Sequence, residues 1–320
     1  MVISVLLGLL SCVYTESCPT DYEVYPCMCE EDDESGDIKV SCSAQGTTLP
    51  ILKQALSRLI RKRNVQLELS NFKLGAVPSY FFYGIEIKKL KISRCDLDSL
   101  TDDGRPALIG LEYSLEELHI LSSYRKENKP AKLQLGHLRK LREINLSYNV
   151  IRALDDDWFD RGPASLEYLT ISNNGIEKVD ERAFANLINL KKLSFDGNRF
   201  GTIRRSMLPY PARRLDTLEL DNNVLTTVPE DIFSNMPALT SISLRSNRIL
   251  RLDQRTWYPV WQQLNAINLE GNPIECDSHM NWIFNLRRTA AINGHCISPP
   301  ERYGKRLQEF IDSRSRVRLL

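Results

Sequence analysis

Apolar residues recur along most of the chain in a fixed pattern, in which each unit reads L-x-x-L-x-L-x-x-N-x-L. The six clearest units begin at Leu141, Leu166, Leu190, Leu215, Leu239 and Leu264. Their first positions are 25, 24, 25, 24 and 25 residues apart. Repetition at such a fixed period predicts a solenoid, in which each unit is one structural repeat.

The alternation of apolar and polar residues within each unit predicts one short strand. Positions four and six are apolar and the residues between them are polar, which is the period of a strand with one buried face. A single unit cannot bury that face, so successive strands should pair in parallel and build one continuous core. Units of 24 or 25 residues leave little room for a full helix, so we expect short, irregular helical segments.

Three less regular units precede these six. They begin at Asn64, Ile87 and Leu115, which gives nine repeats in total. The third is irregular, and its extra residues, Ser122 to Ala131, predict a protruding loop. An aromatic residue ten positions after the asparagine position is expected to pack as core on the side away from the strands. These aromatic residues are Phe82, Phe159, Phe184, Phe233 and Trp257.

The asparagine position predicts a ladder of buried hydrogen bonds at the turn after each strand. A buried backbone group left without a partner costs about 1–3 kcal/mol, so few side chains suit this position. The predicted ladder residues are Cys95, Asn149, Asn174, Asn198, Asn223, Asn247 and Asn272. We interpret Cys95 as a buried ladder residue and not as a reactive nucleophile, because a thiol can donate a weak hydrogen bond there. Ser123 is a plausible substitute in the third repeat, whereas Phe72 is not one in the first.

The apolar run from Val2 to Leu10 predicts a secretory signal peptide. It is too short to span a bilayer, which needs about 20 residues. Cleavage is expected between Val13 and Cys18, and a short buried element is the alternative interpretation. The sequence shows no second apolar run of membrane-spanning length, so we expect a secreted, extracellular protein with no membrane span.

Cysteine positions agree with secretion. Of the eight cysteines, Cys12 lies in the predicted signal peptide and Cys95 stands alone. The other six gather near the ends, at Cys18, Cys27, Cys29, Cys42, Cys276 and Cys296. Six clustered cysteines make three disulfides plausible in an oxidising compartment, although four N-terminal cysteines allow three pairings. A solenoid exposes apolar ends, so these clusters are expected to form covers.

The cysteine clusters resemble the caps of the extracellular leucine-rich-repeat family. The N-terminal block reads Cys18-x8-Cys27-x-Cys29-x12-Cys42, and the C-terminal block contains Asn272-Pro273-Ile274-Glu275-Cys276. The resemblance implies an α/β solenoid, a right-handed leucine-rich-repeat horseshoe with a parallel concave β-sheet, about nine repeats and disulfide caps at both ends. It also implies the pairs Cys18–Cys29 and Cys27–Cys42. Ser278 stands where this family usually has a second cysteine, which leaves Cys276–Cys296 as the single C-terminal bridge.

The expected organisation is a signal peptide at 1–17, a cysteine-rich N-terminal cap at 18–63, leucine-rich repeats at 64–274, and a C-terminal cap and tail at 275–320. A zinc set of Cys276, His279, His295 and Cys296 is an alternative to the C-terminal bridge. Secretion and the adjacency of His295 and Cys296 favour the disulfide.

A narrower resemblance concerns the order C-P…P-C-x-C…Cys42, the irregular early repeats and the start of the third repeat at Ser114-Leu115-Glu116. These features are similar to small secreted arthropod proteins that resemble the non-catalytic leucine-rich-repeat subunit of a shrimp luciferase, a luciferin monooxygenase. The resemblance implies a role in stabilising a partner, with no chemistry of its own.

The charges and motifs exclude several classes of function. The 42 basic and 41 acidic residues give a net charge of +1, which provides no electrostatic case for binding nucleic acid or an anionic membrane. The sequence lacks G-x-S-x-G, H-E-x-x-H, G-x-G-x-x-G and P-loop patterns. We therefore expect no enzymatic activity, no cofactor and no metal. The acidic residues from Glu30 to Glu34 and Asp37 are interpreted as a solvated loop, with calcium binding as the alternative.

The polar residues between the apolar strand positions should form an outward face, which is the candidate binding surface. Its candidate residues are Lys89, Lys91, Arg94, Glu117, His119, Glu143, Tyr148, Tyr168, Glu219 and Arg245. A basic patch beside an acidic one would steer a protein partner, and ordinary solvation is the alternative. Asn145, in the sequon Asn145-Leu146-Ser147, is a predicted glycosylation site on this face.

These features predict a secreted, non-catalytic protein that binds an extracellular protein through its solenoid surface, in adhesion, matrix or signalling. The alternative is a non-catalytic stabilising subunit of a secreted enzyme such as a luciferase-like monooxygenase. Glycan recognition is disfavoured because few aromatic residues fall on the outward face.

Overall fold

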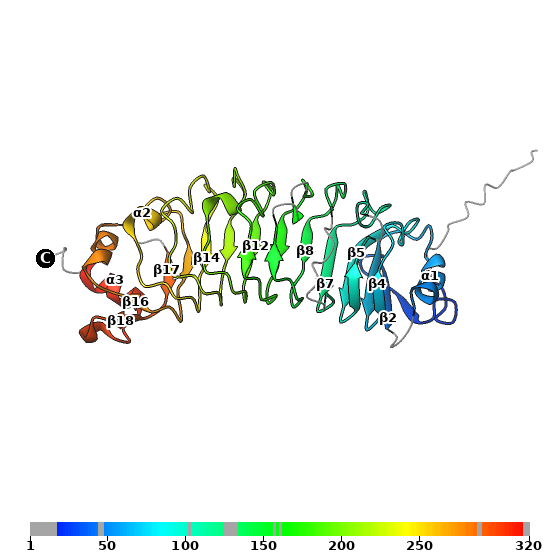
Figure 1. Cartoon of the computed structure of the whole chain (residues 1–320), viewed down its shortest axis with the longest axis horizontal. Coiled ribbons are helices and arrows are strands. Elements are labelled where there is room, and N and C mark those ends of the chain that lie inside the picture. Colours follow the sequence, from blue (N-terminus) through cyan, green and yellow to red (C-terminus); the bar gives the residue numbers. More distant parts are fainter. Residues whose placement is uncertain are drawn as a thin grey trace, which may run out of the picture.

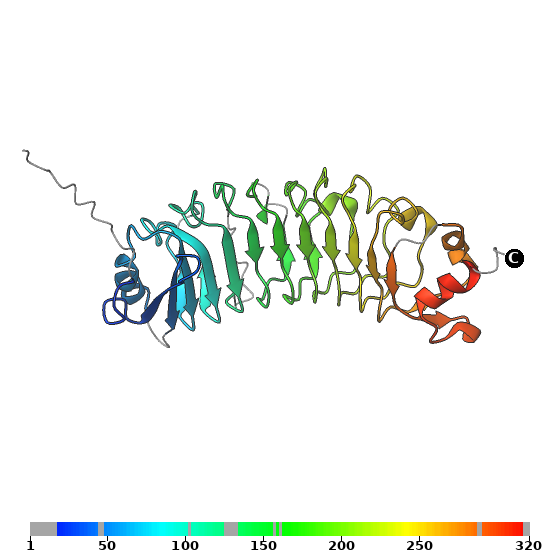
Figure 2. The same cartoon turned by 180° about the vertical axis from the view of Figure 1, so that it is seen from behind.

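The computed structural model describes residues 18–43, 48–101, 104–124, 134–155, 158–159, 162–286 and 290–315. The predicted signal peptide, residues 125–131 of the predicted loop and the last residues of the tail lie outside these ranges. The chain forms an elongated stack in which strands lie side by side from one end to the other (Figures 1 and 2). Because each repeat adds one strand, sequence order and spatial order coincide.

One twelve-stranded sheet runs the length of the stack. Its strands in order are β1 (Cys27–Glu31), β2 (Ile38–Ser43), β3 (Val65–Ser70), β5 (Ile87–Ser93), β7 (Glu117–Leu121), β8 (Glu143–Asn145), β10 (Tyr168–Thr170), β12 (Lys192–Ser194), β13 (Thr217–Glu219), β14 (Ser241–Ser243), β15 (Ala266–Asn268) and β17 (Ala291–Asn293). Only β1 and β2 are antiparallel to each other. Strands β3 to β15 of this sheet are the strands of the nine predicted repeats.

The elements outside the large sheet are short. They include the two-stranded sheets β4 (Lys73–Ala76) with β6 (Asp96–Ser99), β9 (Ala153–Leu154) with β11 (Lys178–Val179), and β16 (Ile274–Glu275) with β18 (Cys296–Ser298). The α-helices are α1 (Leu49–Ser57), α2 (Gln254–Trp257) and α3 (Leu307–Ser315). The 3₁₀ helices among the described residues are η2 (Arg205–Met207), η3 (Ser278–Asn285) and η4 (Pro300–Arg302). Within the described ranges, no helix is long and apolar enough to cross a membrane.

The core is a set of aligned apolar rows. The register pairs Leu90 with Leu118, Leu118 with Ile144, and Ile144 with Leu169, so like positions lie beside like. All of these side chains are fully buried. The predicted aromatic residues on the other side are buried too, and the rings of Phe159 and Phe184 are 6.1 Å apart.

The ladder asparagines link each repeat to its neighbours. The Asn149 Nδ2 donates to the carbonyl of Leu146 in its own repeat and to that of Ile120 in the preceding repeat, both at 2.8 Å. The backbone N–H of Asn149 donates in turn to the Oδ1 of Asn174, at 3.0 Å. The Cys95 thiol makes longer contacts, at 3.4 and 3.6 Å, with the carbonyls of Ser93 and Leu69. The polar interior is therefore a chain of bonds between repeats.

The residue before each ladder position adopts a positive φ in all nine repeats. Five of these residues are asparagine or glycine, which tolerate this conformation better than most, and two are serine, whose side chain is small. Gly197 shows the constraint clearly, because a Cβ there would lie 2.2 Å from the Asn173 Oδ1. Arg94 and Tyr148 are the departures, with φ of 53° and 62°. Every repeat therefore has the same turn conformation, whatever residue occupies this position. The side chains of Arg94 and Tyr148 are exposed to solvent at this turn.

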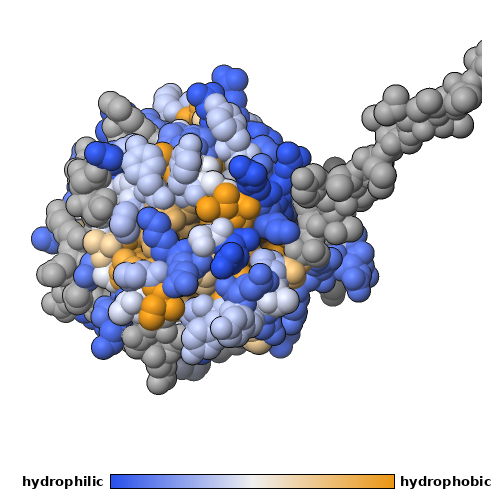
Figure 3. Space-filling model, turned by 90° about the vertical axis from the view of Figure 1, so that its right-hand side faces the viewer, coloured by the Kyte–Doolittle hydropathy of each residue, from blue (hydrophilic) through white to orange (hydrophobic). Residues whose placement is uncertain are grey.

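Both ends of the solenoid are closed by disulfide-bonded caps. The N-terminal cap contains Cys18–Cys29 and Cys27–Cys42, and the C-terminal cap contains Cys276–Cys296. The predicted pairings are thus confirmed, and the alternative zinc set is wrong because both of its thiols are in a disulfide. The N-terminal end is mostly hydrophilic, with hydrophobic groups gathered near its middle (Figure 3).

Asp37 connects the N-terminal cap to the first two repeats. Its Oδ2 accepts hydrogen bonds from the Gln66 Nε2 at 2.8 Å and the Lys88 Nζ at 2.9 Å. Its side chain is only 5% exposed, so this predicted member of a solvated acidic loop is a buried, paired residue.

Candidate functional site

We define the sheet face as the outward-pointing residues of strands β3 to β17 of the large sheet, together with the turn residues that directly follow these strands. Seven of the ten predicted binding residues lie on its strands, and Arg94, Tyr148 and Arg245 lie in its turns. The strands therefore bring all ten candidates to one continuous surface. The structure differs from the prediction in how their charges are arranged.

The basic residues of β5 do lie beside acidic residues on the neighbouring strands, but their charges pair with each other across the strands. The Lys89 Nζ lies 2.5 Å from the Glu117 Oε2, and the Lys91 Nζ lies 2.9 Å from the Glu68 Oε1. The parallel register causes this pairing, since it places Lys91 opposite Glu68 and Lys89 opposite Glu117. Each cation is neutralised by a carboxylate on the neighbouring strand, which leaves this part of the face with little free charge.

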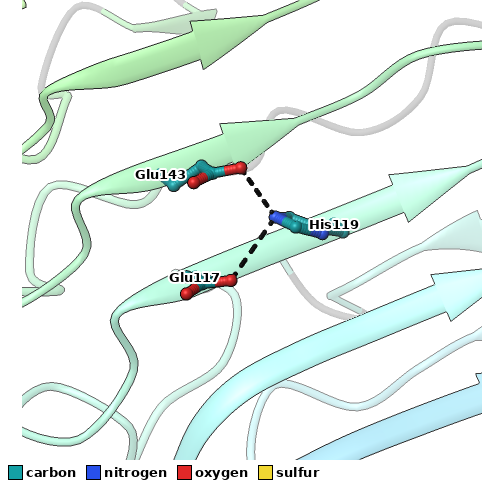
Figure 4. A group of neighbouring side chains, drawn as sticks. All are labelled: Glu117, His119 and Glu143. Atoms are coloured by element: carbon teal, nitrogen blue, oxygen red, sulfur yellow. Dashed lines mark hydrogen bonds and ion pairs between the residues drawn. The ribbon is translucent and has the colours of Figure 1, made fainter.

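Glu117, His119 and Glu143 form a cluster on β7 and β8 (Figure 4). The His119 Nε2 lies 3.1 Å from the Glu143 Oε1 and 3.8 Å from the Glu117 Oε2. Burial lowers the pKa of His119 below its ordinary value, against the opposing effect of the Glu143 carboxylate. At neutral pH the imidazole is therefore uncharged, and it points between two carboxylates.

Pairing continues in the middle of the sheet face. The Lys192 Nζ lies 2.7 Å from the Glu219 Oε1, and the Lys191 Nζ lies 5.9 Å from the centre of the Tyr168 ring. Tyr148 is 63% exposed and Tyr168 is 40% exposed. Both tyrosines were predicted as binding residues, and both rings are exposed on the sheet face.

The C-terminal end of the sheet face is hollowed into a cavity of about 500 Å³. Arg245 and Glu270 come from the last repeats, whereas His295, Arg306 and Gln308 come from the C-terminal cap. The His295 Nδ1 lies 3.1 Å from the Glu270 Oε1. The guanidinium groups of Arg245 and Arg306 have no hydrogen-bond or ion-pair partner among the residues that the structure describes.

The sequence pattern predicted Arg245 as part of the outward face, but it did not place the cap residues His295, Arg306 and Gln308 beside it. Residues 291 to 308 follow no repeat pattern, so nothing in the sequence placed them beside β14 and β15. Glu117, His119 and Glu143 were each predicted to lie on the outward face, but the sequence pattern did not predict that they form a cluster. The spacing offered a signal there, because Glu117 and Glu143 hold the same position in successive repeats.

Asn145 lies half-buried on the sheet face, beside His119 in the register. Its Oδ1 accepts hydrogen bonds from the Ser147 backbone N–H at 3.0 Å and from the Ser147 Oγ at 2.7 Å. Glycosylation of Asn145 stays a prediction.

A family model described as leucine rich repeat matches residues 132–176 and 213–274. The fold is that of the leucine-rich-repeat proteins. One similar solved structure is a chain of the octameric complex of Latrophilin 3, Unc5D and FLRT2 (LRR), with a TM-score of 0.56 at 19% identity, covering 78% of this chain and 82% of that one. None of these matches indicates an enzyme family.

Two further leucine-rich-repeat structures are similar. Human 5T4 (Wnt-activated inhibitory factor 1, trophoblast glycoprotein) has a TM-score of 0.54 at 20% identity, covering 88% of this chain and 94% of that one. A chain of the TLR13–ssRNA13 complex has a TM-score of 0.59 at 21% identity, covering 72% of this chain but only 31% of that one. The TM-scores show a shared fold, and identities near 20% show no more than that.

Proposed function

We propose that this protein is secreted and non-catalytic, and that it binds another extracellular protein through the C-terminal part of its sheet face. The observation that carries the proposal is the hollow with two unpaired guanidinium groups, Arg245 and Arg306. The three disulfides support an oxidising compartment. FLRT2, which shares the fold, is found in a complex with Latrophilin 3 and Unc5D.

The electrostatics favour this end of the face over the N-terminal end. A partner docking over Lys89 or Lys91 would have to desolvate or break existing ion pairs, at a cost in free energy. A partner carboxylate that enters the hollow instead meets guanidinium groups, which bind carboxylates in a planar, bidentate geometry. We therefore expect the partner to present aspartate, glutamate or a chain-terminal carboxylate to Arg245 and Arg306.

Cross-linking mass spectrometry on native extracellular fluid tests this proposal. Lys305 is adjacent to Arg306 in the cap, so its cross-links should report on a partner at the hollow. The double variant R245E/R306E should lower the yield of these cross-links by about tenfold or more, since one lost charged contact of about 1.4 kcal/mol is a factor of ten.

The matched control is R182E/R213E, which changes the net charge by the same amount on exposed residues outside the strands. This variant should keep the cross-links of the unaltered protein. Equal loss in both double variants, or no loss in R245E/R306E, would contradict docking at the hollow.

A role as the stabilising subunit of a secreted enzyme remains the second proposal. The three structures named above do not bear on the resemblance to the luciferase subunit, so this role stays a prediction. Co-purification of an enzyme that loses stability without this chain would favour it.

A further inference from the structure

Two like charges lie directly opposite each other on neighbouring strands at Glu117 and Glu143. Carboxylates in such cross-strand pairs repel, and this arrangement destabilises a sheet unless a cation lies between them. Elsewhere in the N-terminal part of the face, the register places glutamate opposite lysine. The pair on β7 and β8 therefore departs from the local rule, and such departures gather at functional sites.

The existing cations compensate this pair only in part. Glu117 is bonded to Lys89, but the one ion-pair partner of Glu143 among the described residues is His119. The structure thus holds two carboxylates against a single lysine, with an imidazole nitrogen between them. The deficit is one positive charge at a defined point on the sheet face.

The three side chains are arranged so that one ion can contact all of them. One ligand atom from each of Glu117, His119 and Glu143 lies within 4.8 Å of the other two. All three side chains project from the same face of β7 and β8, and both carboxylates point at the imidazole (Figure 4). The His119 side chain is 14% exposed, so its position is restricted by its neighbours, while the cluster still opens to solvent.

We propose that Glu117, His119 and Glu143 bind a divalent transition-metal ion of the zinc class. One imidazole and two carboxylates are a donor set that zinc accepts, at about 2.0–2.2 Å from each ligand atom, with a fourth position left open. Calcium is a poorer fit because it requires about six to eight oxygen ligands. The open position faces outward, where water or a donor from a bound molecule completes the coordination. This proposal replaces the expectation of a chain without a metal.

Lys89 competes with the ion for Glu117, and this competition makes the proposal specific. Metal binding requires that the Glu117 carboxylate turn away from the Lys89 Nζ, now 2.5 Å away. Replacing Lys89 by methionine keeps an unbranched side chain, one heavy atom shorter, and removes its charge. K89M should therefore bind metal more tightly than the unaltered protein, whereas loss of a ligand should weaken binding.

The chain also contains a matched control. His295 and Glu270 form a histidine–carboxylate pair with the same 3.1 Å distance as His119 and Glu143. That pair is not part of a three-ligand cluster within the described residues. If a histidine beside one carboxylate were enough to bind the ion, the two sites would behave alike.

The experiment is a calorimetric titration of tag-free protein with Zn²⁺, repeated with Co²⁺, whose visible absorption reports a tetrahedral site. We expect one saturable site, with affinity raised several-fold in K89M and unchanged in H295A. In H119A and E143Q the affinity should fall by at least about 10–100-fold, the loss that removal of an outer-shell partner already causes. Circular dichroism of each variant verifies that the fold is retained.

The opposite result is equally clear. If the unaltered protein binds Zn²⁺ no better than H119A, or if H295A loses binding to the same extent, the site does not exist as proposed. E143Q keeps the shape of the side chain, so its effect does not depend on a cavity left by truncation.

Discussion

The two ends of the sheet face have the same parallel-strand backbone, but they differ in whether their charged side chains are paired. At the N-terminal end, β3, β5 and β7 contain 6, 7 and 5 residues, and their lysines and glutamates are paired across strands. At the C-terminal end, β13, β14 and β15 contain three residues each. Their outward residues are mostly small and neutral, and two arginines line a hollow without partners. A surface that satisfies its own charges stabilises the sheet, whereas one that does not is available to a partner.

The caps extend this comparison, because the N-terminal cap has two disulfides and the C-terminal cap has one. We expect C276A/C296A to lower the free energy of unfolding by about 2–5 kcal/mol. C18A/C29A should lower it less, since Cys27–Cys42 still holds that cap together. Urea unfolding followed by tryptophan fluorescence measures both variants, with three of the four tryptophans at Trp257, Trp261 and Trp282 near the C-terminal end. An equal loss for the two bridges would show that the caps do not differ in this way.

The ladder differs between the two ends as well. The Asn247 Nδ2 donates at 2.9 Å to the carbonyls of Leu220 and Leu244, and its Oδ1 accepts from the Leu225 N–H. N247A leaves these groups unpaired and should cost about 2–4 kcal/mol, whereas C95A should cost less than about 1.5 kcal/mol because the thiol bonds are long and weak. The same unfolding measurement decides the point. A larger cost for C95A than for N247A would contradict the weaker role given to the thiol.

The smallest expected effect concerns Asp37, which anchors the N-terminal cap. Burial acts to raise the pKa of Asp37, but the hydrogen bonds from Lys88 and Gln66 outweigh it and hold the pKa below its usual value. The stabilisation by Asp37 is therefore present at neutral pH and is lost as the pH falls through the lowered pKa, below about 4. D37N should cost about 1–2 kcal/mol at about pH 7 and less at about pH 3.

Unfolding of the unaltered protein and of D37N at both pH values is the measurement for Asp37. A difference between the two proteins that stays constant with pH would rule out the paired carboxylate as its cause. K305M, which removes a charge from a half-buried residue of the other cap, serves as a control that should show no such pH dependence.

The fold was predictable because its information is local and repeated. The positions of Leu169 and Asn174 within one unit define a strand and a turn, and six similar units define their stacking. The disulfides followed from a family resemblance in the cysteine blocks. The ion pairs Glu68–Lys91 and Lys89–Glu117 depend on which residues face each other on neighbouring strands. The pattern within a single repeat does not contain this register, so it predicted separate basic and acidic patches.

The functional surface was less predictable for a physical reason. The hollow combines Arg245, from a regular repeat, with Arg306, from a cap that has no period. Only the folded cap brings these guanidinium groups together. The positive φ at Arg94 and Tyr148 was likewise invisible in the hydrophobic pattern, because that pattern records burial and not backbone conformation.

The asparagine ladder makes successive repeats interchangeable, so a repeat can be removed without leaving hydrogen-bonding groups unpaired. Asn198, Asn223 and Asn247 each donate to a carbonyl of their own repeat and to the matching carbonyl of the one before. Excising one complete unit would therefore bring equivalent donors and acceptors into contact at the new junction. Such an excision would change the distance between the Glu117 cluster and the C-terminal hollow by one strand spacing, about 4.8 Å, while leaving each site intact.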